Sequence, residues 1–245
     1  MRIAPAALVL AVAAIFTACG RTSIEERPYA YRDAAPSDSA GTGRLYFGRE
    51  IARVTTHRGG AEWLERPTRE NTELPDRLVA NMDLRPSDVV ADIGAGTGYF
   101  TFRIAERVPT GRVLAVDIQQ EMLDDIAARR DSLGVRNVET VLGTERSPNL
   151  ATESIDVALM VAAYHEFFYP WEMMTSIYDA LRPGGRVVLI DYRAEDETLE
   201  VNRLHRLSEQ QATRELEAAG FDYRFSRDIL PQQHFIVFEK PFGAG

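Results

Sequence analysis

The chain of 245 residues contains a single cysteine, Cys19, and a single lysine, Lys240. One cysteine permits no internal disulfide, so the cellular compartment has to be judged from other features. Acidic residues outnumber basic ones and give a net charge of −9. A nucleic-acid partner is not expected, because binding to phosphates requires a basic face.

Several sequence motifs of catalytic and metal-binding sites are also missing. The sequence has no Gly-x-Ser-x-Gly turn, which leaves a serine hydrolase with little support. The four histidines, His57, His165, His205 and His234, show no close ligand spacing. Only convergence in the folded chain would make a metal site of them, and no metal is predicted.

The N-terminus is the one long apolar stretch. Met1-Arg2 is a short basic start, Ile3–Phe16 is apolar, and Cys19 follows Ala18. This plan is typical of a signal peptide over residues 1–18 and is too short for a confident membrane span. It resembles the bacterial lipobox, in which the cysteine is acylated, although Phe16 stands where leucine is usual.

A lipidated Cys19 would place the protein at the membrane, exported to the periplasmic side of the envelope, and cytoplasmic if the signal is not used. Residues 19–43 are rich in Ser, Pro, Ala, Asp and Gly, which predicts a flexible tether. Residues 44–73 have a partly helical pattern broken at Gly59-Gly60, which predicts a helical cap over the pocket.

From residue 74 onward, apolar runs alternate with helical patterns. Strands are predicted in the apolar run that ends at Asp92 and at 112–117, 138–142, 155–161 and 186–192, with helices at 99–108, 120–133 and 171–181. A helix at 208–219 and an antiparallel pair at 221–227 and 234–239 follow. This order indicates an α/β, doubly wound, mainly parallel sheet covered on both faces, in a domain over residues 74–245.

The most informative stretch is 89–100, in which an apolar run reaches Asp92 and turns through Gly94, Gly96 and Gly98. A strand, a glycine turn and a helix start form the geometry that holds a nucleotide-like ligand. The dinucleotide fingerprint needs a third glycine at position 99, where Tyr99 stands. That departure favours a ligand without phosphates, and Asp92 would suit an ammonium group.

The pattern from Asp92 to Gly98 resembles motif I of class I S-adenosylmethionine-dependent methyltransferases. Asp117 at the end of the second apolar run, a fourth run at 154–161 and the corner Pro183-Gly184-Gly185 extend the resemblance over about residues 74–239. It implies a Rossmann-like sheet of seven strands, mostly parallel with an antiparallel C-terminal strand, and S-adenosylmethionine as cofactor.

The resemblance also assigns roles to individual residues. Asp117 would bind both ribose hydroxyls, and Ile118 would lie beside the adenine. Thr144 stands where the family often has an acid near the adenine amino group, and whether Glu145 replaces it is left open. The cofactor-binding residues so implied are Asp92, Gly94, Ala95, Gly96, Thr97, Gly98, Tyr99, Asp117, Ile118, Gly143, Thr144 and Val161.

The candidate catalytic residues follow the fourth strand directly, at the edge of the sheet where ligands bind. Methyl transfer requires alignment of donor and acceptor, and removal of a proton from a hydroxyl or ammonium acceptor. His165 is the best base by its ordinary pKa, Tyr164 could position the acceptor, and Glu166 could orient the histidine or bind a cation. The alternative is that His165 only packs near the cofactor.

The sequence therefore predicts methyl transfer to a small molecule. The Pro-Pro-Tyr type signature of base methylation is absent, and a lone cysteine disfavours arsenic methylation. The alternative is an exported, lipid-anchored binding protein with a catalytically inactive methyltransferase fold. Because S-adenosylmethionine is made in the cytoplasm, three resolutions stay open: no export, a supply of cofactor outside, or loss of catalysis.

Overall fold

The computed structural model describes residues 31–242. The expected signal peptide, Cys19 and residues 20–30 of the expected tether lie outside the described residues. Within the described part, no helix is both long and apolar enough to cross a bilayer.

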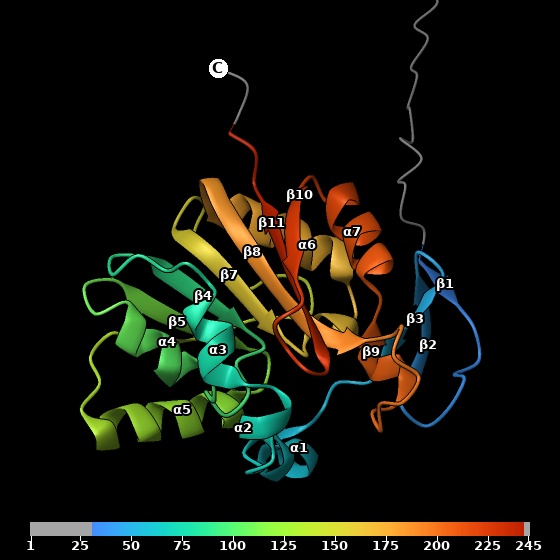
Figure 1. Cartoon of the computed structure of the whole chain (residues 1–245), viewed down its shortest axis with the longest axis horizontal. Coiled ribbons are helices and arrows are strands. Elements are labelled where there is room, and N and C mark those ends of the chain that lie inside the picture. The colour runs from blue at the N-terminus through green and yellow to red at the C-terminus, as the bar shows by residue number, and fades with distance from the viewer. Residues whose placement is uncertain (1–30, 243–245) are drawn as a thin grey trace, which may run out of the picture.

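A single large sheet forms the centre of the protein (Figure 1). Its seven-strand path runs β10-β11-β8-β7-β4-β5-β6, and short β9 pairs with β8 as an eighth strand. All neighbours are parallel except β11, which is antiparallel to both β8 and β10. The predicted fold class is confirmed. The strands are β4 (Val89–Ile93), β5 (Arg112–Asp117), β6 (Val138–Leu142), β7 (Ile155–Val161), β8 (Leu181–Arg193), β9 (Arg206–Leu207), β10 (Asp222–Arg227) and β11 (Gln233–Glu239).

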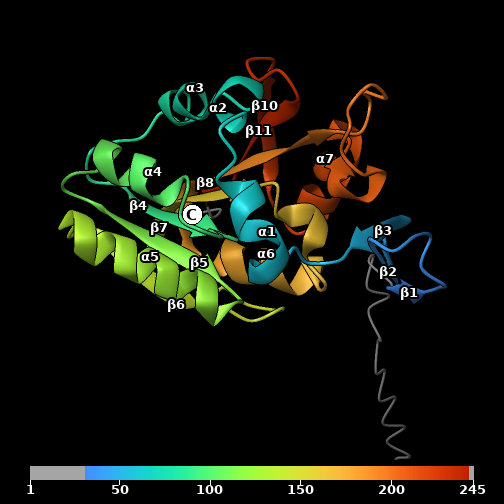
Figure 2. The same ribbon diagram turned by 90° about the horizontal axis from the view of Figure 1, so that it is seen from below.

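Helices cover both faces of this sheet (Figure 2). On one face α3 (Pro75–Ala80), α4 (Thr101–Arg107) and α5 (Gln120–Leu133) pack on alternate residues of the strands. On the other face α6 (Pro170–Ala180) and α7 (Glu209–Ala218) pack on the remaining ones. Central strands buried on both faces explain why they are continuous apolar runs.

The helix α7 begins and ends as its sequence predicts. The Ser208 hydroxyl accepts a hydrogen bond from the Gln211 amide at 3.1 Å, which satisfies one of the free amides of the first turn. Gly220 follows the helix with φ +96°, a conformation that glycine adopts without strain.

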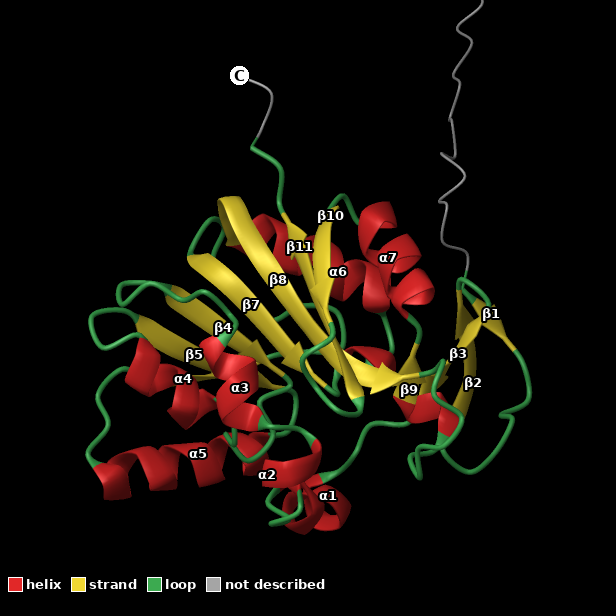
Figure 3. Cartoon of the chain, in the orientation of Figure 1, coloured by secondary structure: helices red, strands yellow, loops and turns green. Residues whose placement is uncertain are grey.

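The segment before the first helix differs from the prediction. Residues 44–52 were expected to be helical, but β2 (Gly41–Tyr46) and β3 (Arg49–Ala52) form a hairpin, to which β1 (Arg32–Asp33) adds a third strand (Figure 3). The expected tether over 19–43 is also wrong at its end, since part of it belongs to these strands. Phe47 and Gly48 both have positive φ, 49° and 88°, as a two-residue hairpin turn requires.

Two short helices then lead to the sheet, α1 (His57–Leu64) and α2 (Arg69–Thr72). The predicted break at Gly59-Gly60 is wrong, because α1 runs through both glycines. At Gly60 a Cβ atom would lie 2.3 Å from Thr55 Cγ2, so the glycine permits close packing rather than ending the helix.

A buried ion pair attaches the hairpin to the main domain. Arg49 of β3 donates two hydrogen bonds to Glu215 of α7, at 3.0 and 2.9 Å. The Glu215 side chain is fully buried, and that of Arg49 is 10% exposed. Tyr164 and Gln211 also donate to this carboxylate, at 2.7 and 2.6 Å. Glu215 therefore depends on its partners for its charge to remain in the interior.

We expect Arg49→Met to destabilise the protein by about 3–5 kcal/mol, because it leaves the Glu215 carboxylate buried without its cation. The double variant Arg49→Met, Glu215→Gln should recover most of that loss. Denaturant unfolding measures both. The control Arg112→Met removes an exposed pair with Glu139 and should cost less than about 1 kcal/mol. A double variant as unstable as Arg49→Met would contradict the assignment.

Candidate functional site

The glycine loop lies at the carboxyl end of β4, in the middle of the sheet. Gly94, Gly96 and Gly98 have φ values of 73°, 55° and 79°. A Cβ at Gly94 would lie 2.7 Å from Ala163 Cβ, and one at Gly96 would lie 2.9 Å from Leu64 Cδ1. The loop therefore needs glycine both for its backbone conformation and for its close neighbours.

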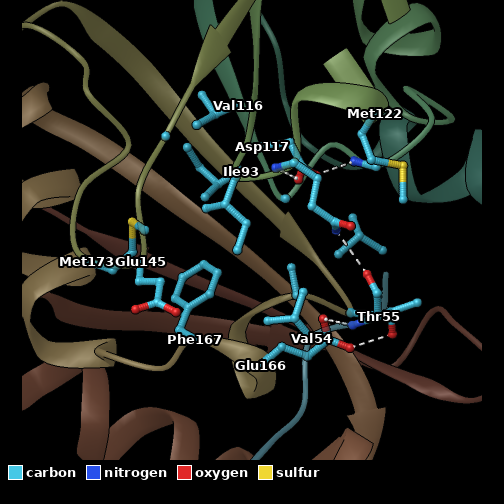
Figure 4. A pocket seen from close by; sticks show the side chains of 18 of the residues that line it. Val54, Thr55, Ile93, Val116, Asp117, Met122, Glu145, Glu166, Phe167 and Met173 are labelled. Carbon is cyan, nitrogen blue, oxygen red and sulfur yellow. Dashed lines mark hydrogen bonds between the residues drawn. The ribbon is translucent and has the colours of Figure 1, made fainter. Parts of the chain in front are cut away.

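A cavity of about 870 Å³, partly open to solvent, lies at this edge of the sheet (Figure 4). Seven of the residues assigned to the cofactor from sequence line it: Gly94, Gly96, Asp117, Ile118, Gly143, Thr144 and Val161.

Asp117 is the charged group at the tip of β5. Its Oδ2 accepts a hydrogen bond from the Gly96 amide at 2.9 Å, and its Oδ1 accepts one from the Gln119 amide at 2.9 Å. Burial raises the pKa of this carboxyl above its ordinary value, while these amides act against the shift. Each oxygen keeps a further lone pair, so the carboxylate can still accept two ligand hydroxyls.

The other predicted cofactor residues, Asp92, Ala95, Thr97, Gly98 and Tyr99, do not line this cavity. Asp92 is buried and accepts a hydrogen bond from Thr101 Oγ1 at 2.6 Å. Thr97 and Tyr99 donate to Glu65 and Glu70 on the outer side of the loop. The proposed contact of Asp92 with an ammonium group is not what the structure shows. The carboxyl supports the start of α4 instead.

Burial raises the pKa of Asp92 to about 6, and the charge of Asp117 adds to the effect, whereas the hydrogen bond from Thr101 opposes it. This group is therefore kept away from water and destabilised in its charged form.

Part of the cavity wall was not predicted from the sequence. Val54, Thr55, Trp63 and Leu64 come from residues 44–73, the segment expected to cover the pocket, whereas Gln119 and Met122 at the start of α5 were not predicted. Phe167, Phe168 and Met173 follow β7, and Glu145 follows Thr144. Most are apolar side chains without motif spacing, so their position depends on the tertiary fold.

The predicted catalytic residues form one 3-10 turn, η1 (Tyr164–Glu166), directly after β7. Tyr164 lies in neither this cavity nor its neighbour, because its ring is buried and its hydroxyl donates to Glu215. Its predicted role in positioning an acceptor is therefore wrong in this structure. Glu166 lines the first cavity, and both His165 and Glu166 line a second one.

The second cavity, of about 790 Å³, adjoins the first. Thr55, Trp63, Ala162 and Glu166 line both. Its remaining wall is formed by Gly59, Gly60, His165, Tyr192, Glu200, Val201, Asn202 and His205.

His165 is almost fully buried and bonded at both ring nitrogens. Its Nδ1 lies 2.8 Å from Asp191 Oδ1, and its Nε2 lies 3.0 Å from His205 Nδ1. Burial lowers the pKa of His165, but the charge and hydrogen bond of Asp191 outweigh burial and leave this pKa raised. A buried ring with both nitrogens engaged cannot take a proton directly from a ligand in either cavity.

Glu166 is held by the strand-to-helix linker that precedes α1. Its Oε2 accepts a hydrogen bond from the Thr55 amide at 3.0 Å, and its Oε1 accepts one from Thr55 Oγ1 at 2.7 Å. Figure 4 shows this pair on the side of the cavity away from Asp117. Burial raises the pKa of Glu166, but hydrogen bonds from His205 and Thr55 and the charge of His165 outweigh it, so the pKa is lowered.

The other two histidines lie elsewhere. His57 Nε2 pairs with Asp125 at 2.7 Å, and His234 Nε2 pairs with Glu195 at 2.9 Å, both with exposed partners. His205 forms part of the wall of the second cavity.

Comparison with known proteins agrees with this geometry. Residues 90–185 match the family model described as a methyltransferase domain. A tRNA U34 carboxymethyltransferase of Desulfotalea psychrophila is 34% identical over 114 residues, 46% of this chain and 35% of that protein. The uncharacterized methyltransferase YcgJ of Bacillus subtilis is 28% identical over 167 residues, 67% of this chain and 65% of that protein. The chain thus spans about one third to two thirds of the length of these relatives.

Solved structures share the fold. A SAM-dependent methyltransferase from Aquifex aeolicus superposes with a TM-score of 0.72 at 21% identity, covering 76% of this chain and all (100%) of that one. The [4+2]-cyclase SpnF superposes with a TM-score of 0.61 at 16% identity, covering 69% of this chain and 80% of that one. Residues 90–185 thus match a methyltransferase domain model, and the chain shares the Rossmann-like fold of the methyltransferase structure, which implies S-adenosylmethionine as the cofactor.

The raised pKa of Asp92 predicts a specific pH dependence of stability. The pKa is about 6 in the folded state and 3.8 in the absence of the fold, so the folded state binds more protons between these values. The contribution of Asp92 to stability should therefore fall as pH rises from 4 to 6, by on the order of 2 kcal/mol.

Asp92→Asn should be more stable than the native protein at pH 7, and the difference should vanish near pH 4. Denaturant unfolding at both pH values measures it. Asp131→Asn, at an exposed side chain, is the control and should change stability by less than about 0.5 kcal/mol. An advantage of Asp92→Asn that is equal at both pH values would contradict the buried-charge interpretation.

Proposed function

We propose that this protein transfers the methyl group of S-adenosylmethionine to a small-molecule acceptor. The observation that carries the proposal is the cavity of about 870 Å³ that combines the glycine loop with Asp117 at the tip of the next strand. Fold alone does not give this function, because SpnF has a similar fold and is a [4+2]-cyclase.

The residues of the first cavity fit a sulfonium nucleoside. Asp117 offers carboxylate oxygens for a ribose diol, and Ile118, which is 39% exposed, offers an apolar surface for a flat base. Thr144 is occupied, because its hydroxyl accepts hydrogen bonds from the amides of Arg146 and Ser147. We therefore propose that the amino group of the adenine ring binds Glu145, which lines the cavity.

The bound cofactor would supply a methyl group on a positively charged sulfur. When the methyl group is transferred, the rest of the cofactor leaves as a neutral thioether, which needs no protonation. The protein's own task is then alignment and exclusion of water. Phe167, Phe168 and Met173 form apolar walls of the cavity. Glu166, shared by both cavities, marks the boundary at which donor and acceptor meet.

The acceptor is assigned to the second cavity. Its wall includes two carboxylates, Glu166 and Glu200. With a net charge of −9, the chain lacks the electrostatic attraction that a polynucleotide needs. The acceptor named for the tRNA-modifying relative is therefore not carried over to this chain.

We expect S-adenosylmethionine and S-adenosylhomocysteine to bind in a calorimetric titration, with Asp117→Ala weakening both by about a hundredfold or more. Two charge-assisted hydrogen bonds to the ribose are lost, each contributing about 1.5–3 kcal/mol. Asp131→Ala, at an exposed acid on α5, is the control. Native protein that is folded and ignores millimolar cofactor would refute the proposal.

The same samples separate an enzyme from a binding protein. Incubation of labelled cofactor with cell extract should yield a labelled small molecule, and Glu166→Ala should abolish it while cofactor still binds. Binding without product, across acceptor fractions, would favour the alternative of an inactive methyltransferase fold that holds a nucleoside-like ligand.

We further propose that the mature protein is a lipoprotein anchored through Cys19 and exported to the periplasmic side of the envelope. The basic start, the apolar segment and the position of Cys19 after Ala18 support this. Lipidation of the cysteine would hold the domain at the membrane without inserting it.

The intact mass of the native protein should show cleavage before Cys19 and the added mass of acyl chains, with the protein in the membrane fraction. Cys19→Ser should lose both features, because a hydroxyl does not replace the acylated thiol. A native protein that starts at Met1 with an unmodified Cys19 would contradict export by this route.

A further inference from the structure

Three side-chain atoms of the second cavity converge on one point. His205 Nδ1 lies 3.0 Å from His165 Nε2 and 3.3 Å from Glu166 Oε1. The third separation, between His165 Nε2 and Glu166 Oε1, is 3.8 Å. These residues come from η1 after β7 and from η2 (Arg203–His205) before β9. The fold thus joins groups that the sequence separates by about forty positions.

Each of the three groups is oriented by a neighbour. Asp191 binds His165 Nδ1 through Oδ1 and Oδ2, at 2.8 and 3.0 Å. Thr55 fixes the Glu166 carboxylate through its amide and hydroxyl. Asn202 caps η2 by accepting from the Leu204 amide at 2.8 Å, which positions His205. A carboxylate on the far nitrogen of a histidine is the arrangement found behind metal-ligating imidazoles.

The cluster offers lone pairs to a cation when both imidazoles are neutral. With Asp191 accepting at Nδ1, a neutral His165 ring carries its proton there and presents a lone pair at Nε2. Glu166 Oε1 also presents lone pairs, and both atoms face His205 Nδ1. Only 2% of the His165 side chain and 12% of that of Glu166 are exposed, so water has little access to these atoms. A cation bound between them would be ligated by all three.

We propose that His165 Nε2, His205 Nδ1 and Glu166 Oε1 form a binding site for a divalent transition-metal ion, with Zn²⁺ as the fitting ion. Two imidazoles and one carboxylate are a ligand set of catalytic zinc sites, which keep a position open. Tetrahedral zinc with these ligands separates neighbouring ligand atoms by about 3.3 Å. The three separations of 3.0, 3.3 and 3.8 Å bracket that value.

The open position of such an ion faces the second cavity, where His205 is the most exposed ligand, at 23%. A consequence that rests on the proposed function is the class of acceptor: a small molecule with an oxygen or nitrogen able to ligate the ion. The ion would hold that atom beside the boundary marked by Glu166. Binding of the ion itself does not rest on the proposed function.

The test is equilibrium dialysis of the untagged full chain against Zn²⁺, followed by metal analysis. A single ion should bind per chain, and His205→Ala should weaken binding by at least about tenfold. His234→Ala is the matched control, since it removes a histidine that pairs with a carboxylate outside the cluster. Cys19→Ser, which removes the only thiol of the chain, should leave binding unchanged.

A second variant tests whether a loss of zinc binding could result from unfolding. Glu166→Gln keeps a side-chain oxygen for Thr55 but removes the charge, and should also weaken zinc binding while unfolding at a similar denaturant concentration. Substituted Co²⁺ should give visible absorption bands of a low-coordinate site in the native protein that His205→Ala loses.

Two results would overturn the metal site: no bound zinc above that of the His205→Ala variant, or equal binding by all variants. Either would mean that a shared proton holds the cluster together. Titration with S-adenosylmethionine keeps this separate from the function proposed above. Zinc binding without cofactor binding would refute methyl transfer but support the metal site. Cofactor binding without zinc binding would refute the metal site but leave the proposed methyl transfer in place.

Discussion

The attachment of the glycine loop to the neighbouring strand determines the rest of the site. The amides of Gly94 and Ala95 both donate to Val116 O, at 2.8 and 3.0 Å, and the Gly96 amide donates to Asp117. These bonds turn the chain away from the sheet at the end of β4 and leave its edge open. They also fix Asp117 at that edge, so the loop and the acid form one rigid unit.

The strands were predictable because each one is marked by a short apolar run in the sequence. The runs at 112–117 and 155–161 have the bounds of β5 and β7, since strands buried on both faces are mostly apolar. The run at 138–142 has the bounds of β6, which lies at the edge of the sheet and is only partly buried. The hairpin was missed because its signal is the turn Phe47-Gly48. Phenylalanine rarely takes a positive φ, and tertiary packing of Tyr46 and Ile51 beside Trp171 stabilises it there.

The candidate site was predictable only where a motif fixes the backbone. The positions of Asp117 and the glycines follow from the strand-and-turn pattern. Asp92 and Tyr164 also lie near strand ends, but their side chains point into the interior. Sequence does not give the direction of a side chain beyond a strand end. The meeting of His165 with His205 depends on β9 pairing with β8, a long-range contact without a periodic signal.

The anchoring of β3 has a consequence for the size of the independently folding unit. Arg49 donates to the His165 carbonyl at 3.1 Å as well as to Glu215, and β3 lies against both η1 and η2. The turn that carries His165 and Glu166 is thus braced from outside the region matched by the family model. A fragment trimmed to residues 90–185 would lose this brace, the α7 carboxylate it neutralises and His205, so a fragment that keeps these contacts has to include β3 and extend through α7.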